Sequence, residues 1–398
     1  MQAVVLTEVY SLFKARRPPL QFSNSFETVY QYLANDHEAL DPLPGDLGMA
    51  TSAAHLDDFL DSTARTTGIM SKQRLLASCY VLDSQHATLF GRHRTTCYSG
   101  AGMDLPFPTS LIAWDGQRRT SYRVEPHDRV WQALDGGNID DGAQQRPYDV
   151  FQSMLMIACL TDSSNEGDGS YPTDPSKDFA PIVGAMHQSA QIKMAYNTFM
   201  LCKHTPVRYL LAVAGESWVM AEKLSNRADY VASQIEARDW ASAAGYPSDF
   251  NAAGLDIEQQ APIDKAVRHA LRIIELHLNH PKSGLLFQEW SVYLAAVVIW
   301  AHAHVATSAF AVQESQLSGA NVAAPALSAH ELEQAVSEIV ATAGRLLPDR
   351  ENARRVLLWA KAAIEKVDVP HNCGLTNGAL DVLGKLVSRG TEDGWFGV

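Results

Sequence analysis

Histidines gather in two consecutive segments with helical patterns, and they are the first candidates for chemistry. His269, His277 and His280 fall in one segment, and His302 and His304 follow in the next, within the apolar run WAHAHV. A helix turns His302 and His304 roughly 160° or more away from each other. Zinc needs three or four converging ligands. We therefore expect no metal site here, and hydrogen-bonded core roles for His302 and His304.

Large aromatic residues share the second of these segments. Trp290, Tyr293 and Trp300 recur at intervals of three and seven, which places them on one helix face. Such a face usually fills a core, but rings that leave a gap also line an apolar ligand pocket. Trp218 follows Leu210 by eight positions, so we expect both on one side of an earlier helix.

These two patterns supply the candidate site residues. The ligand-binding candidates are Trp218, Trp290, Tyr293, Trp300 and His302. The catalytic candidates, which would donate a hydrogen bond to a substrate carbonyl, are His277, Tyr293 and His302. The chain has no P-loop, G-x-G-x-x-G, G-x-S-x-G, H-E-x-x-H or EF-hand pattern. We therefore expect no cofactor.

Composition narrows the class of protein. Of 398 residues, 46% are hydrophobic and 19% are charged, which is typical of a globular chain and excludes wholesale disorder. The net charge is −13 and the basic residues are scattered, so direct binding of nucleic acid is disfavoured. Five widely spaced cysteines fit neither a disulfide framework nor a zinc site. They indicate buried free thiols in a reducing compartment, the cytoplasm or the nucleus.

One stretch is long enough to cross a membrane. Residues 291–310 carry no formal charge. However, two histidines and several small polar residues interrupt the stretch, and it lacks basic flanking anchors. A helix at the centre of a large helical protein is apolar on all sides as well. We therefore expect a buried core helix and no membrane span.

Start and stop signals mark several helices. Pro262 stands at a helix-opening position, and residues 280–281 end that helix. Ser328 and Glu331 fit a capping box. Asp349 and Thr376 are expected to cap the last two helices. Each of these segments is amphipathic and must dock against neighbours.

The expected architecture is all-α, a large irregular multi-helix bundle. Strand-like alternation is scarce outside residues 120–124, and no repeat period of roughly 20–50 residues is present. Residues 161–178 combine glycine, proline, serine and acids, which predicts a long acidic loop. We expect residues 1–398 to form a single domain.

Six segments, taken in order, form a recognisable series. They are TEVYSLFKARRPPLQFSNSF (7–26), RLLASCYVLDSQHATLFGRH (74–93), DLPFPTSLIAWDG (104–116), HTPVRYLLAVAGESWVMAEKLS (204–225), LFQEWSVYLAAVVIW (286–300) and CGLTNGALDVLGKLVSRG (373–390). Together they resemble the regulatory, middle homology domain that follows paired C2H2 fingers in fungal transcription factors. They sample nearly the whole chain. The resemblance implies the all-helical fold of that domain and a regulatory role.

The chain departs from this family in one respect that bears on function. It has no C2H2 or Zn2Cys6 finger pattern, so the part that reads bases in the major groove is missing. Taken as complete from Met1, the chain would have to act in trans, or its helical scaffold would serve another purpose.

Two functions are therefore carried forward. In the first, the protein is a regulatory or small-molecule-sensing protein of fungal secondary metabolism. In the second, it is a cofactor-free biosynthetic enzyme, a cyclase, isomerase or Diels-Alderase, that holds a hydrophobic product in a helical pocket. The expected partners are a hydrophobic small molecule or another protein, and a homodimer is left open.

Overall fold

The structure is a computed structural model. It describes residues 1–41, 56–95, 104–110, 128–135, 148–160, 180–215, 226–243, 261–314, 328–342, 349–367 and 373–389, with the backbone alone at 56–64, 66, 180–182 and 305–314. Every named element in these residues is an α-helix, and a single isolated bridge joins Pro106 and Arg129. The all-α prediction is confirmed. The expected loop at 161–178 and the strand-like residues 120–124 lie outside the described residues.

Contacts divide the chain into two compact units. The first comprises Met1–Val9, Gln21–Ala87 and His93–Ile192, and the second comprises Tyr10–Leu20, Thr88–Arg92 and Lys193–Val398. Three helices contribute residues to both units: α1 (Gln2–Lys14), α4 (Leu56–Phe90) and α9 (Ala190–Lys203). That all 398 residues form a single domain stays a prediction.

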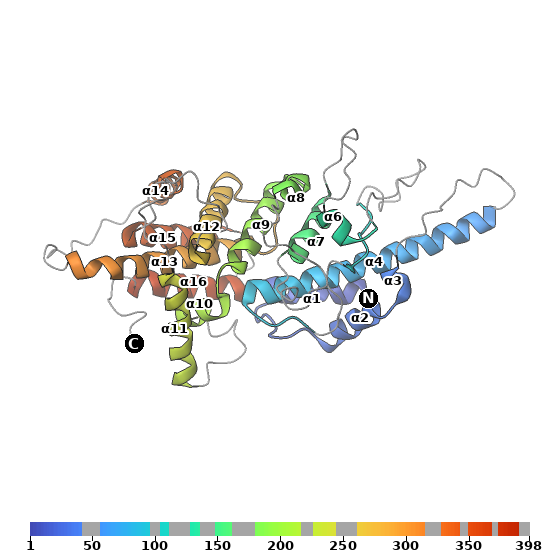
Figure 1. The fold of residues 1–398 in the computed structure, drawn as a ribbon, viewed down its shortest axis with the longest axis horizontal. Coiled ribbons are helices and arrows are strands. Elements are labelled where there is room, and N and C mark those ends of the chain that lie inside the picture. Colours follow the sequence, from blue (N-terminus) through green and yellow to red (C-terminus); the bar gives the residue numbers. More distant parts are fainter. Residues whose placement is uncertain are drawn as a thin grey trace. The chain divides into compact units, whose positions relative to one another are not determined.

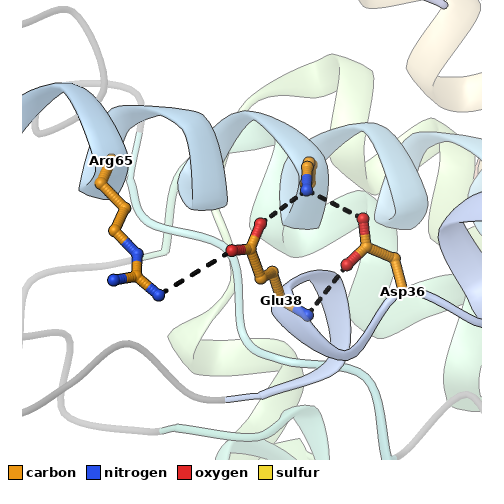
Figure 2. A network of polar contacts seen from close by, with 4 residues as sticks. Asp36, Glu38 and Arg65 are labelled. Atoms are coloured by element: carbon orange, nitrogen blue, oxygen red, sulfur yellow. Dashed lines mark hydrogen bonds and ion pairs between the residues drawn. The ribbon is translucent and has the colours of Figure 1, made fainter.

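The first unit also holds α2 (Asn24–Ala34), α3 (His37–Leu40), α6 (Val130–Asp135), α7 (Val150–Leu160) and α8 (Ala180–Ala185). An exposed polar network fastens the short α3 to α4 (Figure 2). Lys72 Nζ lies 2.9 Å from Asp36 Oδ2 and 2.6 Å from Glu38 Oε2. Asp36 caps α3 by accepting the Glu38 amide proton. The network holds a four-residue helix that has little intrinsic stability of its own.

The second unit is built around α13 (Gln288–Glu314), which packs against α11, α12, α15 and α16 (Figure 1). Its other helices are α10 (Val207–Ala214), α11 (Arg227–Ser242), α12 (Pro262–Asn279), α14 (Ala329–Thr342), α15 (Arg350–Glu365) and α16 (Gly374–Arg389). Residues 290–304 of α13 are all buried, as is expected of the central helix of a bundle. None of the described helices combines the length and hydropathy needed to cross a bilayer.

Local signals place the ends of several helices correctly. Glu331 accepts the Ser328 amide proton at 2.7 Å while its own amide donates to the Ser328 hydroxyl, so the predicted capping box is confirmed. Asp349 accepts from the amide of Asn352 at 2.7 Å. Pro262 opens α12, which ends at Asn279. These contacts satisfy backbone donors that a helix start leaves unpaired.

The start of α16 corrects one prediction. The helix begins at Gly374 and not after Thr376. Long-range contacts fix this start, because Cys373 Sγ donates to the Phe13 carbonyl and the Gly374 amide donates to the Ala15 carbonyl at 2.9 Å. A Cβ at position 374 would fall on the carbonyl oxygen of Arg16, so only glycine fits.

The thiols agree with the sequence analysis. Among the described residues, Cys79, Cys159, Cys202 and Cys373 are buried thiols that form no disulfide. Burial raises the pKa of the Cys202 thiol, which keeps it protonated and unreactive. Cys97 lies outside the described residues.

Candidate functional site

The first turns of α13 hold Trp290 and Tyr293 inside the core. Trp290 is 1% exposed, and its Nε1 donates a hydrogen bond to the Leu89 carbonyl at 3.0 Å. The centroid of the Trp290 ring lies 4.8 Å from that of Tyr293 and 5.3 Å from that of Phe90. Because the polar atom of Trp290 already has a partner, the indole serves packing.

A small cavity lies beside Trp290. Its wall includes Phe13, Phe287 and Leu375, and its volume is about 10 Å³. A space of this size holds about one water molecule, whereas ligand pockets span roughly 300–1,000 Å³. Trp290 therefore borders a packing defect, and Tyr293 does not reach it.

His277 belongs to a polar corner between α12 and α13. Its Nδ1 lies 2.9 Å from Nε2 of the buried Gln288. The same Nε2 donates to the Pro281 carbonyl at 2.8 Å, while Oε1 accepts from the amide and the hydroxyl of Ser283. This orientation of the amide makes His277 Nδ1 an acceptor, so the neutral ring carries its proton on Nε2. The imidazole meets the Trp359 ring edge-on at 5.6 Å.

Burial lowers the pKa of His277 to about 4, so the ring is neutral at pH 7. Gln288 holds this neutral imidazole, and the indole of Trp359 packs against it. Together these contacts stabilise the turn of the chain between α12 and α13. His277 thus has a structural role. It lines neither the cavity beside Trp290 nor a second cavity, beside Trp300, that is described below.

His302 is a core residue, as expected, but in the described part of the chain it lacks the hydrogen bonds that we expected. It is 1% exposed, yet neither ring nitrogen has a hydrogen-bond partner among the described residues. Burial lowers its pKa to about 4. A buried polar atom without a partner costs about 1–3 kcal/mol. His302 lines neither of the cavities beside Trp290 and Trp300, so within the described structure it is an unsatisfied core residue.

Trp300 lies two turns beyond Tyr293, at the wall of a second cavity. His304 of α13 and both Arg350 and Arg354 of α15 line the same cavity. The rings of Trp300 and His304 are 5.2 Å apart. The two arginines are one turn apart and share a face of α15. The apolar wall consists of Ala303, Ala353, Leu357 and Leu386. We call this cavity the Trp300 pocket.

The Trp300 pocket brings cationic and aromatic groups together. Arg354 Nε is buried and has no hydrogen-bond partner among the described residues. A guanidinium group is a planar fork of donors that matches a carboxylate or a phosphate. The enclosed volume is about 10 Å³, as in the cavity beside Trp290, so there is room inside for about one oxygen atom of a ligand and no more. An aromatic ring that carries a carboxylate fits this arrangement chemically.

Sequence reasoning found one half of this pocket. Trp300 was a ligand-binding candidate, whereas Arg350 and Arg354 were missed. One feature of the sequence could have indicated them. In DRENARR, which begins with the Asp349 cap, Arg350 and Arg354 are four positions apart and so share a helix face. Nothing in the sequence connects that spacing with Trp300.

The remaining candidate, Trp218, lies outside the described residues. The helix that carries Leu210 ends at Ala214, where Gly215 adopts a left-handed conformation with φ of 92°. The expectation that Leu210 and Trp218 lie on one side of a helix stays a prediction, because Trp218 is not among the described residues. The glycine stops the helix because it adopts this conformation without steric cost.

Within the described chain, no three His, Cys, Asp or Glu side chains are grouped so that they could hold a metal ion. No protein-family model, curated protein or solved structure matches this chain. The resemblance to the fungal regulatory domain therefore stays a prediction.

Proposed function

We propose that the chain is a regulatory protein that binds a small aromatic carboxylate in the Trp300 pocket and acts through a partner protein. The observation that carries the ligand class is Arg354, whose buried Nε lacks a partner while Trp300, His304 and Arg350 surround the same space. A carboxylate oxygen would supply the missing acceptor.

Charge supports an anionic ligand. The chain has a net charge of −13, yet two guanidinium groups line this small space. A carboxylate there exchanges hydration for charge-assisted hydrogen bonds, which are stronger than neutral ones.

The regulatory role is supported by the ordered resemblance of six segments to the fungal transcription-factor domain. The enzymatic alternative requires a cavity that encloses a hydrophobic product. The cavities beside Trp290 and Trp300 measure about 10 Å³ each and enclose no such product, so the ordered resemblance is our reason to favour regulation over a cyclase or Diels-Alderase.

The ligand proposal is tested by calorimetry with benzoate, and with benzamide as the neutral isostere. We expect benzoate to bind and benzamide to bind at least about tenfold more weakly, because the amide carries no charge. Arg354→Met should reduce benzoate affinity by about tenfold or more. Arg354→Lys should recover part of it, since an ammonium group keeps the charge without the fork.

Arg355 supplies the matched control. It is the next residue of α15, and its Nε is also buried without a hydrogen bond among the described residues, but that Nε lies 3.3 Å from a carboxylate oxygen of Glu351 and Arg355 does not line the pocket. Arg355→Met should leave benzoate binding unchanged. Equal loss in both variants, or equal binding of benzoate and benzamide, would show that the Trp300 pocket does not recognise a carboxylate.

A further inference from the structure

Two imidazoles meet beside the end of α9. His204 directly follows Lys203, the last residue of α9, and His269 lies in the middle of α12. The planes of the two rings are within 11° of each other, with centroids 6.1 Å apart. The Tyr196 ring meets His269 edge-on at 6.2 Å. Both histidines are partly exposed, so a solute can reach them.

Two hydrogen bonds of Asn197, which we call the Asn197 relay, determine which ring nitrogen of His269 carries the proton. Asn197 Nδ2 donates to the Lys193 carbonyl at 2.7 Å, so Asn197 Oδ1 faces the other way and lies 2.9 Å from His269 Nδ1. An amide oxygen only accepts, so Nδ1 of His269 must be the donor. The neutral ring therefore keeps a lone pair on Nε2. That nitrogen is ready to take a proton and become a second donor.

Three cationic residues flank this pair along the chain: Lys203 precedes His204, Arg268 precedes His269, and Lys265 lies one helical turn before His269 on α12. Burial lowers the pKa of both histidines to about 4, and Lys265 and Lys203 contribute to this at His204. At His269 the second and third causes are His204 and Arg268. Ammonium and guanidinium groups attract anions, and here three of them lie close in sequence to the two imidazoles.

His204 is held in place by a separate element. Trp240 of α11 donates from Nε1 to the His204 carbonyl at 2.8 Å. The residue that follows α9 is thus tied to α11, while Asn197 ties α9 to α12. Three helices position the imidazoles, which is the preorganisation that a binding site needs.

We propose that His204 and His269, with Lys203, Lys265 and Arg268, form a binding site for a phosphate dianion, either free or as a small phosphate monoester. The site shares no residue with the Trp300 pocket and does not rest on the proposed function.

Phosphate matches these groups better than a carboxylate. A phosphate monoester carries a charge of about −1.5 to −2 at pH 7 and has three strong acceptor oxygens. Ammonium and guanidinium donors give charge-assisted hydrogen bonds to such oxygens. A dianion would also stabilise a proton on His269 Nε2, because the Asn197 relay keeps Nδ1–H occupied.

The test uses the full chain with ¹³C-labelled histidine, titrated with inorganic phosphate at pH 7 and low salt. His204→Gln and His269→Gln identify the two imidazole signals. We expect both signals to move with phosphate, and that of the buried His302 to stay. Signals of His204 and His269 that do not respond to millimolar phosphate would overturn the proposal.

Charge variants supply the second measurement. Lys265→Gln should weaken phosphate binding in calorimetry by about tenfold, because a close cationic donor is lost. Arg272→Gln is the matched control, since Arg272 lies on the same helix, is exposed and pairs with Glu275 at 2.6 Å. It should weaken binding by less than about twofold through screened long-range charge. Equal weakening in the two variants would contradict a local site.

Two further experiments distinguish a phosphate monoester from free phosphate, and this proposal from that of the Trp300 pocket. Tighter binding of phenyl phosphate than of inorganic phosphate would assign the site to a monoester, and equal binding would assign it to free phosphate. Arg354→Met should leave phosphate binding intact, so failure of the Trp300 pocket proposal is distinguishable from failure of this one. If Lys265→Gln does not fold, the wild-type titration decides.

Discussion

Two buried histidines of the second unit have the same protonation state and opposite surroundings. His277 is 6% exposed and His302 is 1% exposed, and burial lowers the pKa of each to about 4. At His277 the ring is held by Gln288, which is itself held by Ser283 and Pro281. At His302 neither ring nitrogen has a partner among the described residues.

The difference separates what burial does from what hydrogen bonding does. Burial alone keeps both rings neutral, since it penalises the charged form. Only the His277 corner converts its polar atoms into contacts that stabilise the fold. A buried histidine in a sequence thus predicts a neutral ring better than it predicts a structural contact.

The largest effect is expected from breaking the satisfied corner. Gln288→Ala removes acceptors and donors for Ser283, Pro281 and His277 at once. We expect the free energy of unfolding to fall by about 2–4 kcal/mol, because each buried polar group left unpaired costs about 1–3 kcal/mol. Urea unfolding followed by circular dichroism measures this. Leu286→Ala, at a 47% exposed position two residues earlier, is the control and should cost clearly less.

The corner also shows how far sequence can predict this fold. Helix starts set by neighbours in sequence, such as the Ser328–Glu331 box and the Asp349 cap, were predicted because their hydrogen bonds are local. The start at Gly374 was not, because its contacts reach back to Ala15. The Trp300 pocket was half predicted for the same reason. Its aromatic half follows helical spacing, while its arginines come from a helix that only folding brings there.

We expect the protein to lose stability in acid, because His277 and His302 are both buried as neutral rings. Their folded pKa of about 4 lies below the ordinary value of 6.5. The unfolded chain therefore binds protons first as pH falls. Stability is complete above pH 6.5 and is lost between pH 6.5 and about 4, by about 2 kcal/mol for each ring at pH 5.

The measurement is the difference in unfolding free energy between pH 7 and pH 5, for the wild type and for His302→Leu. We expect the variant to lose about 2 kcal/mol less than the wild type. An identical pH dependence in the two proteins would mean that His302 takes up its proton without cost in the folded state.

At pH 7 the same substitution tests the unpaired nitrogens directly. Leucine has a similar volume and no polar atoms, so His302→Leu should raise the free energy of unfolding by about 1 kcal/mol. His277→Leu should lower it, because Gln288 would lose a partner. A loss of stability in both variants would reveal that His302 makes a contact from beyond the described residues.

The smallest effect is expected where polar groups are paired but exposed. In the network of Figure 2, Arg65 lies 4.0 Å from Glu38, and its side chain is 77% exposed. Solvent screens such a pair, so Arg65→Ala should change the free energy of unfolding by less than about 0.5 kcal/mol. Thermal unfolding at low and high salt checks this, with Arg272→Ala, also in an exposed pair, as the parallel case. A larger, salt-dependent loss at Arg65 alone would show that this network stabilises α3 cooperatively. Pairing at this exposed site would then contribute more than solvent screening of an isolated pair allows.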